Sequence, residues 1–230
     1  MKQSGSLAQL VLIAAIVAGL SYLLPVAWFA GVFAEGTRGS LPLVAWKGAG
    51  VGLLAVYAAM QARSTDGWLI ALVMAFGALG DVLLDAVSMT AGAVAFILGH
   101  ITAIALYLRN RRGHLTLSQK WLATLVLPLG VLIAVLSVPL AQRPGIGIYT
   151  AFVASMAAAA WISRFPRFRT GIGAMMFLVS DLLIFARMGP LAGAAWASSA
   201  VWALYFGGQL LIVLGVTGRL AEGEGESDTI

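Results

Sequence analysis

Residues 68–86 read WLIALVMAFGALGDVLLDA. A run of about 20 mostly apolar residues is what an α-helix needs to cross the hydrocarbon core of a bilayer. The chain contains eight runs of this kind: Leu7–Leu24, Leu41–Met60, Trp68–Ala86, Thr90–Leu108, Trp121–Leu140, Gly145–Ser163, Gly171–Met188 and Leu191–Val216. They lack the residue-by-residue alternation of outer-membrane barrel strands. The sequence therefore predicts an all-α membrane protein, a polytopic bundle of eight transmembrane helices.

The composition excludes the water-soluble enzyme folds. Of 230 residues, 61% are hydrophobic and only 10% are charged, whereas a soluble domain has about 25% charged residues. The chain has no cysteine, which excludes disulfides, thiol nucleophiles and thiolate metal sites. Its two histidines are too few for a multi-histidine metal site. We expect no metal and no cofactor.

Residues 1–219 are predicted to form a single transmembrane domain. The first apolar run follows Lys2 and continues without a small-residue cleavage site, so we expect an uncleaved first helix. Residues 220–230 are acidic and Gly-rich, and we expect a short disordered C-terminal tail there.

The basic residues orient the predicted bundle. Eight spans place both termini and alternate loops on one side, which holds ten of the fourteen basic residues: Lys2, Arg63, Arg109, Arg111, Arg112, Lys120, Arg164, Arg167, Arg169 and Arg219. The positive-inside rule then predicts cytoplasmic termini in a multi-pass protein of the bacterial inner membrane. This explains the net charge of +5 without nucleic acid as a partner. A weaker interpretation is that residues 109–112 and 164–169 hold anionic lipid headgroups.

Three of the nine acidic residues fall inside predicted spans: Asp81, Asp85 and Asp181. A carboxylate at mid-membrane costs roughly 2.5 to 3.5 kcal/mol, so a functional site is the default interpretation. At about 1.5 Å per residue, Asp181 and His100 lie roughly 15 Å into their spans, close to the bilayer midplane. The remaining polar candidates within the spans are Lys47, Arg187, Tyr205 and Gln209.

Helical spacing groups some of these candidates. Asp81 and Asp85 are four residues apart and share a face, as do Tyr205 and Gln209. The segments 76–84 (FGALGDVLL) and 177–184 (FLVSDLLI) are weakly similar, which suggests two parallel four-helix repeats with one aspartate in each. The structural alternative is tight helix packing with polar side chains as interhelical hydrogen-bonding groups. Lys47 is also near enough to the end of its span to extend toward the interface.

The ordered set of polar positions resembles the YhhN family of integral-membrane lysoplasmalogenases. The family pattern has a lysine early in the second span, G-D-x-x-L in the third, F-x-x-x-H in the fourth, F-x-x-S-D in the seventh and Y-x-x-x-Q in the last. The chain matches it at Lys47, Gly80–Leu84, Phe96–His100, Phe177–Asp181 and Tyr205–Gln209. It departs at Gly48, where a proline commonly follows the lysine, and at Ala103, where a tyrosine is expected; the nearest tyrosine is Tyr107.

The resemblance implies hydrolysis of the vinyl-ether bond of a lysoplasmalogen, giving a fatty aldehyde and glycerophosphoethanolamine or glycerophosphocholine. Such hydrolysis needs an acid that protonates a vinyl carbon and a carboxylate that assists water, as in glycosidases. The expected pair is Asp81 and Asp181, and which of them is the acid is left open. The other implied residues are His100 and Lys47 in catalysis, and Asp85, Tyr205, Gln209 and Arg187 in substrate binding. A lysophospholipid and the surrounding membrane lipids are the expected partners.

Other classes of membrane protein share some of these features. A proton- or cation-coupled transporter also uses midplane carboxylates and repeats. A retinal protein would need Lys47 as its Schiff-base lysine, and a membrane metal hydrolase would need more histidines than His100 and His114.

Overall fold

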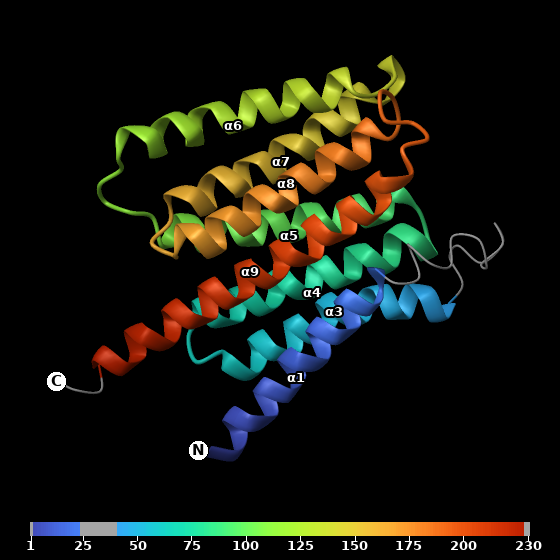
Figure 1. Ribbon diagram of the computed structural model, residues 1–230. Helices are drawn as coiled ribbons and strands as arrows, with labels where there is room; N and C mark the ends of the chain where they lie inside the picture. The colour runs from blue at the N-terminus through green and yellow to red at the C-terminus, as the bar shows by residue number, and fades with distance from the viewer. Residues whose placement is uncertain (1, 24–40, 228–230) are drawn as a thin grey trace. The chain divides into compact units, whose positions relative to one another are not determined.

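The computed structural model describes residues 2–23 and 41–227, and this part of the chain is helical. It forms α1 (Lys2–Ser21), α3 (Leu41–Gln61), α4 (Thr65–Ala86), α5 (Met89–Arg109), α6 (Leu117–Leu136), α7 (Arg143–Ile162), α8 (Ile172–Ala186) and α9 (Ala195–Ser227) (Figure 1). Seven helical stretches among the described residues are long and apolar enough to cross a membrane, and α1 contains a shorter apolar stretch, Gly5–Ser21. The prediction of an all-α polytopic membrane protein is confirmed. Leu24, the predicted end of the first span, lies outside the described residues.

Several helix boundaries differ from the predicted spans, among them the start of α6 and the end of α9. Helix α6 begins at Leu117 instead of Trp121, because Thr116 and Gln119 form a capping box that satisfies backbone groups at the helix start. Helix α9 extends through residues 220–227, where we expected a disordered tail.

The chain forms two compact units. Unit 1 comprises Met1–Thr102 and Leu220–Ile230, and unit 2 comprises Ala103–Arg219. The two boundaries between them fall within α5 and within α9. The single transmembrane domain expected for residues 1–219 stays a prediction.

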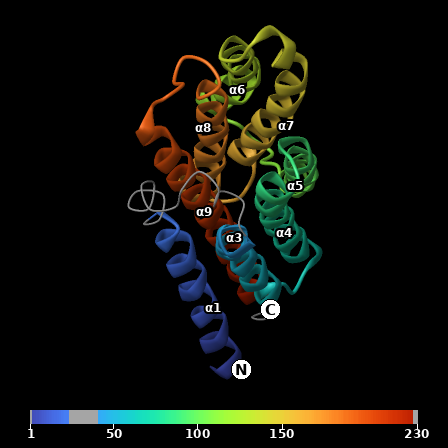
Figure 2. The ribbon, with the colours of Figure 1, turned by 90° about the vertical axis from the view of Figure 1, so that its right-hand side faces the viewer.

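In unit 1, α3 lies beside both α1 and α4 (Figures 1 and 2). A side chain at Gly48 would press on Val82, since its Cβ would lie only 2.7 Å from Cγ2 of that residue. Helix α5 packs on α4 through Gly80, which is covered by the Phe96 ring, and through Gly99, which lies against Phe76. These small residues let the helices approach closely and bring polar positions on α3 and α4 to the same level.

In unit 2, α6 lies beside α7, which in turn contacts α8 (Figure 2). Helices α8 and α9 meet backbone to backbone, because a Cβ on Gly173 or on Gly208 would lie 2.6 Å from the carbonyl oxygen of the other glycine. Buried Ala134, Val138, Ile146 and Phe185 form an apolar cluster in this unit. The Tyr149 ring packs against this cluster, which therefore holds the ring in place.

Candidate functional site

In unit 1, the candidate residues include a lysine and two aspartates on neighbouring helices. Lys47 Nζ on α3 donates a hydrogen bond to Asp85 Oδ2 on α4 at 2.9 Å, and the two side chains are 14% and 28% exposed. One turn earlier on α4, Asp81 is buried, with 3% of its surface exposed. The Lys47 ammonium also attracts the Asp81 carboxylate. Lys47 therefore pairs directly with Asp85 and interacts electrostatically with Asp81 on the same helix.

His100 is buried on α5, in the same unit. It lies one helical turn after Phe96, whose ring covers Gly80, the residue before Asp81. Its neighbour Gly99 contacts Phe76 on α4. Because α4 and α5 pack antiparallel in this register, His100 lies at the level of Phe76, more than one helical turn from Asp81.

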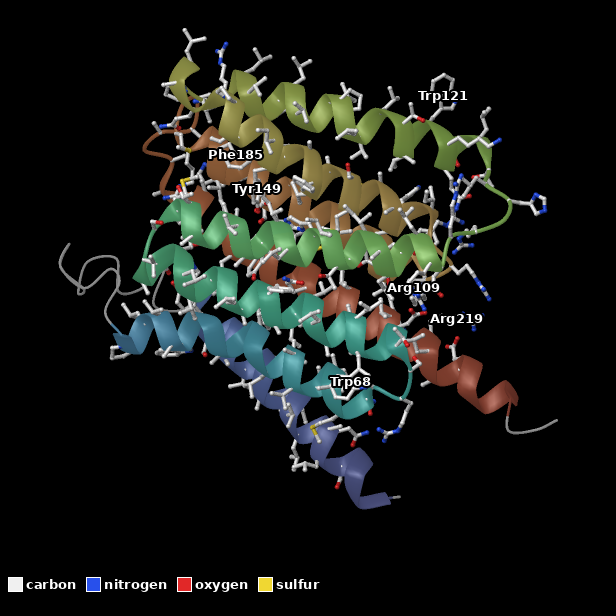
Figure 3. The ribbon with its side chains drawn as sticks, turned by 180° about the vertical axis from the view of Figure 1, so that it is seen from behind. Trp68, Arg109, Trp121, Tyr149, Phe185 and Arg219 are labelled. Carbon is white, nitrogen blue, oxygen red and sulfur yellow. The ribbon has the colours of Figure 1, made fainter. Side chains whose placement is uncertain are left out.

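In unit 2, the candidate residues include Asp181 on α8. This carboxyl is buried, with 5% of its surface exposed, and Tyr149 Oη on α7 donates a hydrogen bond to its Oδ2 at 2.9 Å. The Tyr149 ring meets the Phe185 ring edge to face, with 5.9 Å between centroids and 85° between planes (Figure 3). Phe185 lies one turn beyond Asp181, so the tyrosine is held by the helix that carries its acceptor.

Aromatic side chains of α8 and α9 lie next to Asp181 along the helix. Phe177, one turn before Asp181, packs edge to face on Tyr205 at 5.1 Å between centroids. Trp202 contacts the rings of Tyr205 and Phe206 at 5.6 and 5.9 Å. An apolar aromatic surface of this kind suits a hydrocarbon chain beside a buried acid.

The other predicted substrate-binding residues lie in different surroundings, some buried between helices and one exposed at a helix end. Gln209 is buried one turn beyond Tyr205 on α9, next to Gly208 at the contact with α8. Arg187 is the C-cap residue of α8 and is exposed, a place where a cation is also favourable to the helix dipole. The structure therefore groups Tyr205 with the aromatic side chains and leaves Arg187 at the helix end.

Tyr149 is a residue of the candidate site that the sequence did not single out. It lies near the start of its predicted span, where tyrosine is common as an interfacial anchor, and its partner is 32 residues away. No motif or helical spacing links the two residues. The only indication in the sequence was the polar hydroxyl of Tyr149 within a predicted span.

Tyr107, whose role the sequence left in doubt, is fully buried and packs edge to face on Phe165 at 6.1 Å. Its hydroxyl makes no hydrogen bond within the described residues. Within the same residues, no three His, Asp or Glu side chains gather in a position to hold a metal ion.

Comparison with known proteins gives one match. The sequence model of the YhhN family matches residues 43–216, a segment that contains every candidate residue above. No curated protein and no solved structure matches the chain.

Proposed function

Since the match spans well over half of the chain, the protein belongs to the YhhN family of lysoplasmalogenase-type membrane proteins, and we propose that it hydrolyses the vinyl-ether bond of lysoplasmalogens. The products would be a fatty aldehyde and glycerophosphoethanolamine or glycerophosphocholine. The observation that carries the proposal is the buried Asp181 carboxyl, whose Oδ2 accepts a hydrogen bond from Tyr149 inside an apolar bundle. A carboxyl kept in such a place at a cost in free energy is a functional candidate by default.

In the proposed reaction Asp181 is the acid. It transfers a proton to the vinyl carbon that does not carry the oxygen, and the other vinyl carbon becomes an oxocarbenium ion. Water adds to that carbon and gives up a proton to a carboxylate, and the resulting hemiacetal breaks into the aldehyde and the glycerol hydroxyl. One water is consumed and the acid is reprotonated overall.

Asp81 is the carboxylate of this proposal. The nearby Lys47 ammonium stabilises negative charge on it, since opposite charges attract strongly away from bulk water. Asp85 supports the same assignment, because its ion pair with Lys47 holds the ammonium on this face of α4. His100 is assigned to positioning water, and Tyr205 and Gln209 to hydrogen bonds with the glycerol or phosphate part.

Tyr149 would act in the step in which Asp181 loses its proton. The negative charge that develops on the carboxylate strengthens the hydrogen bond to Oδ2, and an interaction that is stronger in the transition state accelerates the reaction. The other carboxylate oxygen is then the one that delivers the proton.

The test is aldehyde release by the purified protein with lysoplasmalogen. We expect Asp81→Asn and Asp181→Asn to abolish it, while Glu222→Gln, which changes an exposed acid, keeps it. In D₂O the carbon next to the aldehyde should carry one deuterium, and in H₂¹⁸O the glycerol product should stay unlabelled. Full activity of both asparagine variants, or ¹⁸O in the glycerol product, would contradict the proposed chemistry.

A proton- or cation-coupled transporter is the second candidate, because Lys47, Asp81 and Asp85 would also make an ion site. Protein in liposomes separates the two functions. Ion-dependent solute flux without aldehyde release would support transport, and aldehyde release without flux would support the hydrolase.

A further inference from the structure

In unit 2, the connection that follows α5 is hydrogen-bonded to the connection that follows α7. The backbone N–H of Arg112, after α5, donates to Ile162 O at 3.1 Å, and that of Arg164, after α7, donates to Asn110 O at 2.6 Å. These two bonds flank an antiparallel bridge between Arg111 and Ser163. Arg112 also donates through Nε to Ser163 O at 2.6 Å and through Nη2 to Phe165 O at 3.3 Å. The guanidinium of Arg112 therefore adds two hydrogen bonds between the connections.

The two connections and the starts of the helices that follow them carry a group of cations that we call the basic rim: Arg111, Lys120, Arg164, Arg167 and Arg169. All of these side chains are exposed except that of Arg167, which is partly exposed. Unit 2 has a single acidic residue, Asp181, and it is buried in α8. The positive charge of the rim is therefore not neutralised by any carboxylate of its own unit.

Apolar side chains are exposed at the same place. Phe168, between two arginines of the rim, is 77% exposed, and the Arg167 guanidinium lies 5.9 Å from the centre of its ring. Leu117 and Trp121, on either side of Lys120 in the first turns of α6, are 72% and 58% exposed. Trp121 and Arg109 are seen at the same end of the unit in Figure 3. Mixed cationic and aromatic surfaces of this kind are typical of the bilayer interface.

The position of the basic rim relative to the membrane indicates which ligand would bind there. Candidate spans end at Arg109 and Ile162 and begin at Leu117 and Arg167, so the rim lies at the level of the lipid headgroups. Arginine binds phosphate oxygens through two parallel hydrogen bonds. A free anion would use the cations alone, whereas a phospholipid also places acyl chain next to Phe168 and Leu117.

We propose that the basic rim is a binding site for anionic phospholipid headgroups, of which phosphatidylglycerol is the test case. The lipid phosphates are the counterions that unit 2 lacks. Arg111 and Arg164 belong to the two connections that the Arg111–Ser163 bridge joins, so bound lipid phosphates would add contacts to both connections. The proposal is independent of the hydrolase activity.

The experiment measures the thermal unfolding midpoint of the full chain in uncharged detergent during titration with lipid. Phosphatidylglycerol should raise the midpoint, phosphatidylcholine should not, and added salt should weaken the effect. Each basic side chain near an anionic surface contributes about a factor of five in affinity. The Arg111→Gln/Arg164→Gln variant should therefore bind phosphatidylglycerol roughly thirtyfold more weakly.

Two control variants test whether the effect is specific to the basic rim. Arg63→Gln/Arg143→Gln removes two cations outside the rim and should bind like the unchanged protein. Arg111→Lys/Arg164→Lys keeps the charge and should retain most of the affinity, which separates loss of charge from damage to the fold. Equal weakening in both glutamine variants, an equal shift with phosphatidylcholine, or the same shift with inorganic phosphate alone would overturn the proposal.

Discussion

At the scale of single residues, the hydrogen bond from Tyr149 to Asp181 is the contact with the sharpest consequence. A hydrogen bond to a charged group is worth about 1.5 to 3 kcal/mol. Tyr149→Phe should therefore lower kcat for aldehyde release roughly 10- to 100-fold, with little change in KM, because the bond strengthens only as Asp181 loses its proton. The measurement is a substrate titration at several pH values.

Tyr107→Phe is the matched control for that variant. The Tyr107 hydroxyl is buried and makes no hydrogen bond with any described residue, so its removal loses no contact and relieves a buried polar group. We expect an unchanged kcat and a free energy of unfolding higher by about 1 kcal/mol. A drop in kcat equal to that of Tyr149→Phe would show that loss of any buried phenol impairs the enzyme.

The pair of Lys47 and Asp85 is also a residue-scale feature, and a double-mutant cycle measures it. Removing one partner leaves a poorly solvated charge, whereas removing both leaves none. Lys47→Met and Asp85→Leu should each lower the free energy of unfolding. The double variant should lose less than the sum of the two single losses. We expect a coupling free energy of about 0.5 to 3 kcal/mol, measured by unfolding in detergent. Additive effects would contradict a direct pair.

At the scale of elements, the contact between α8 and α9 depends on two glycines. Gly208→Ala would place a methyl group against Gly173 O and should cost about 1 to 3 kcal/mol of stability, as overpacking does. Gly218→Ala, on the same helix with open space around it, should raise the free energy of unfolding by up to about 1 kcal/mol. Unfolding midpoints of the two variants check this, and similar shifts for both would contradict close packing at Gly208.

Helix boundaries were predictable where hydropathy changes sharply and less so where polar residues begin a helix. Helix α4 ends at Ala86, as predicted from the apolar run. Helix α6 begins earlier than its apolar run, because the hydrogen bonds of Thr116 and Gln119 determine its start. The distribution of apolar residues does not reveal helix caps that polar side chains form.

At the scale of the whole molecule, the number of membrane crossings determines where the termini lie. Eight crossings predict both termini on the cytoplasmic side, whereas seven would separate them. The chain lacks cysteine, so single cysteines introduced at Gly5, Gly223 and Gln142 can be labelled in whole cells with a membrane-impermeant maleimide. We expect labelling only at position 142. Labelling at either Gly5→Cys or Gly223→Cys would contradict the predicted orientation.

The sequence by itself determined the helical membrane fold and the short list of ionisable groups that the bilayer contains, because hydropathy and charge are local properties of the chain. It identified Asp81, Asp181, Lys47 and His100 as candidates through their cost in hydrocarbon. Only the tertiary structure decided that Lys47 pairs with Asp85 and that Tyr149 binds Asp181, partners 38 and 32 residues apart. Such contacts depend on the rotation and register of packed helices, which glycines such as Gly48 and Gly80 set through close approach.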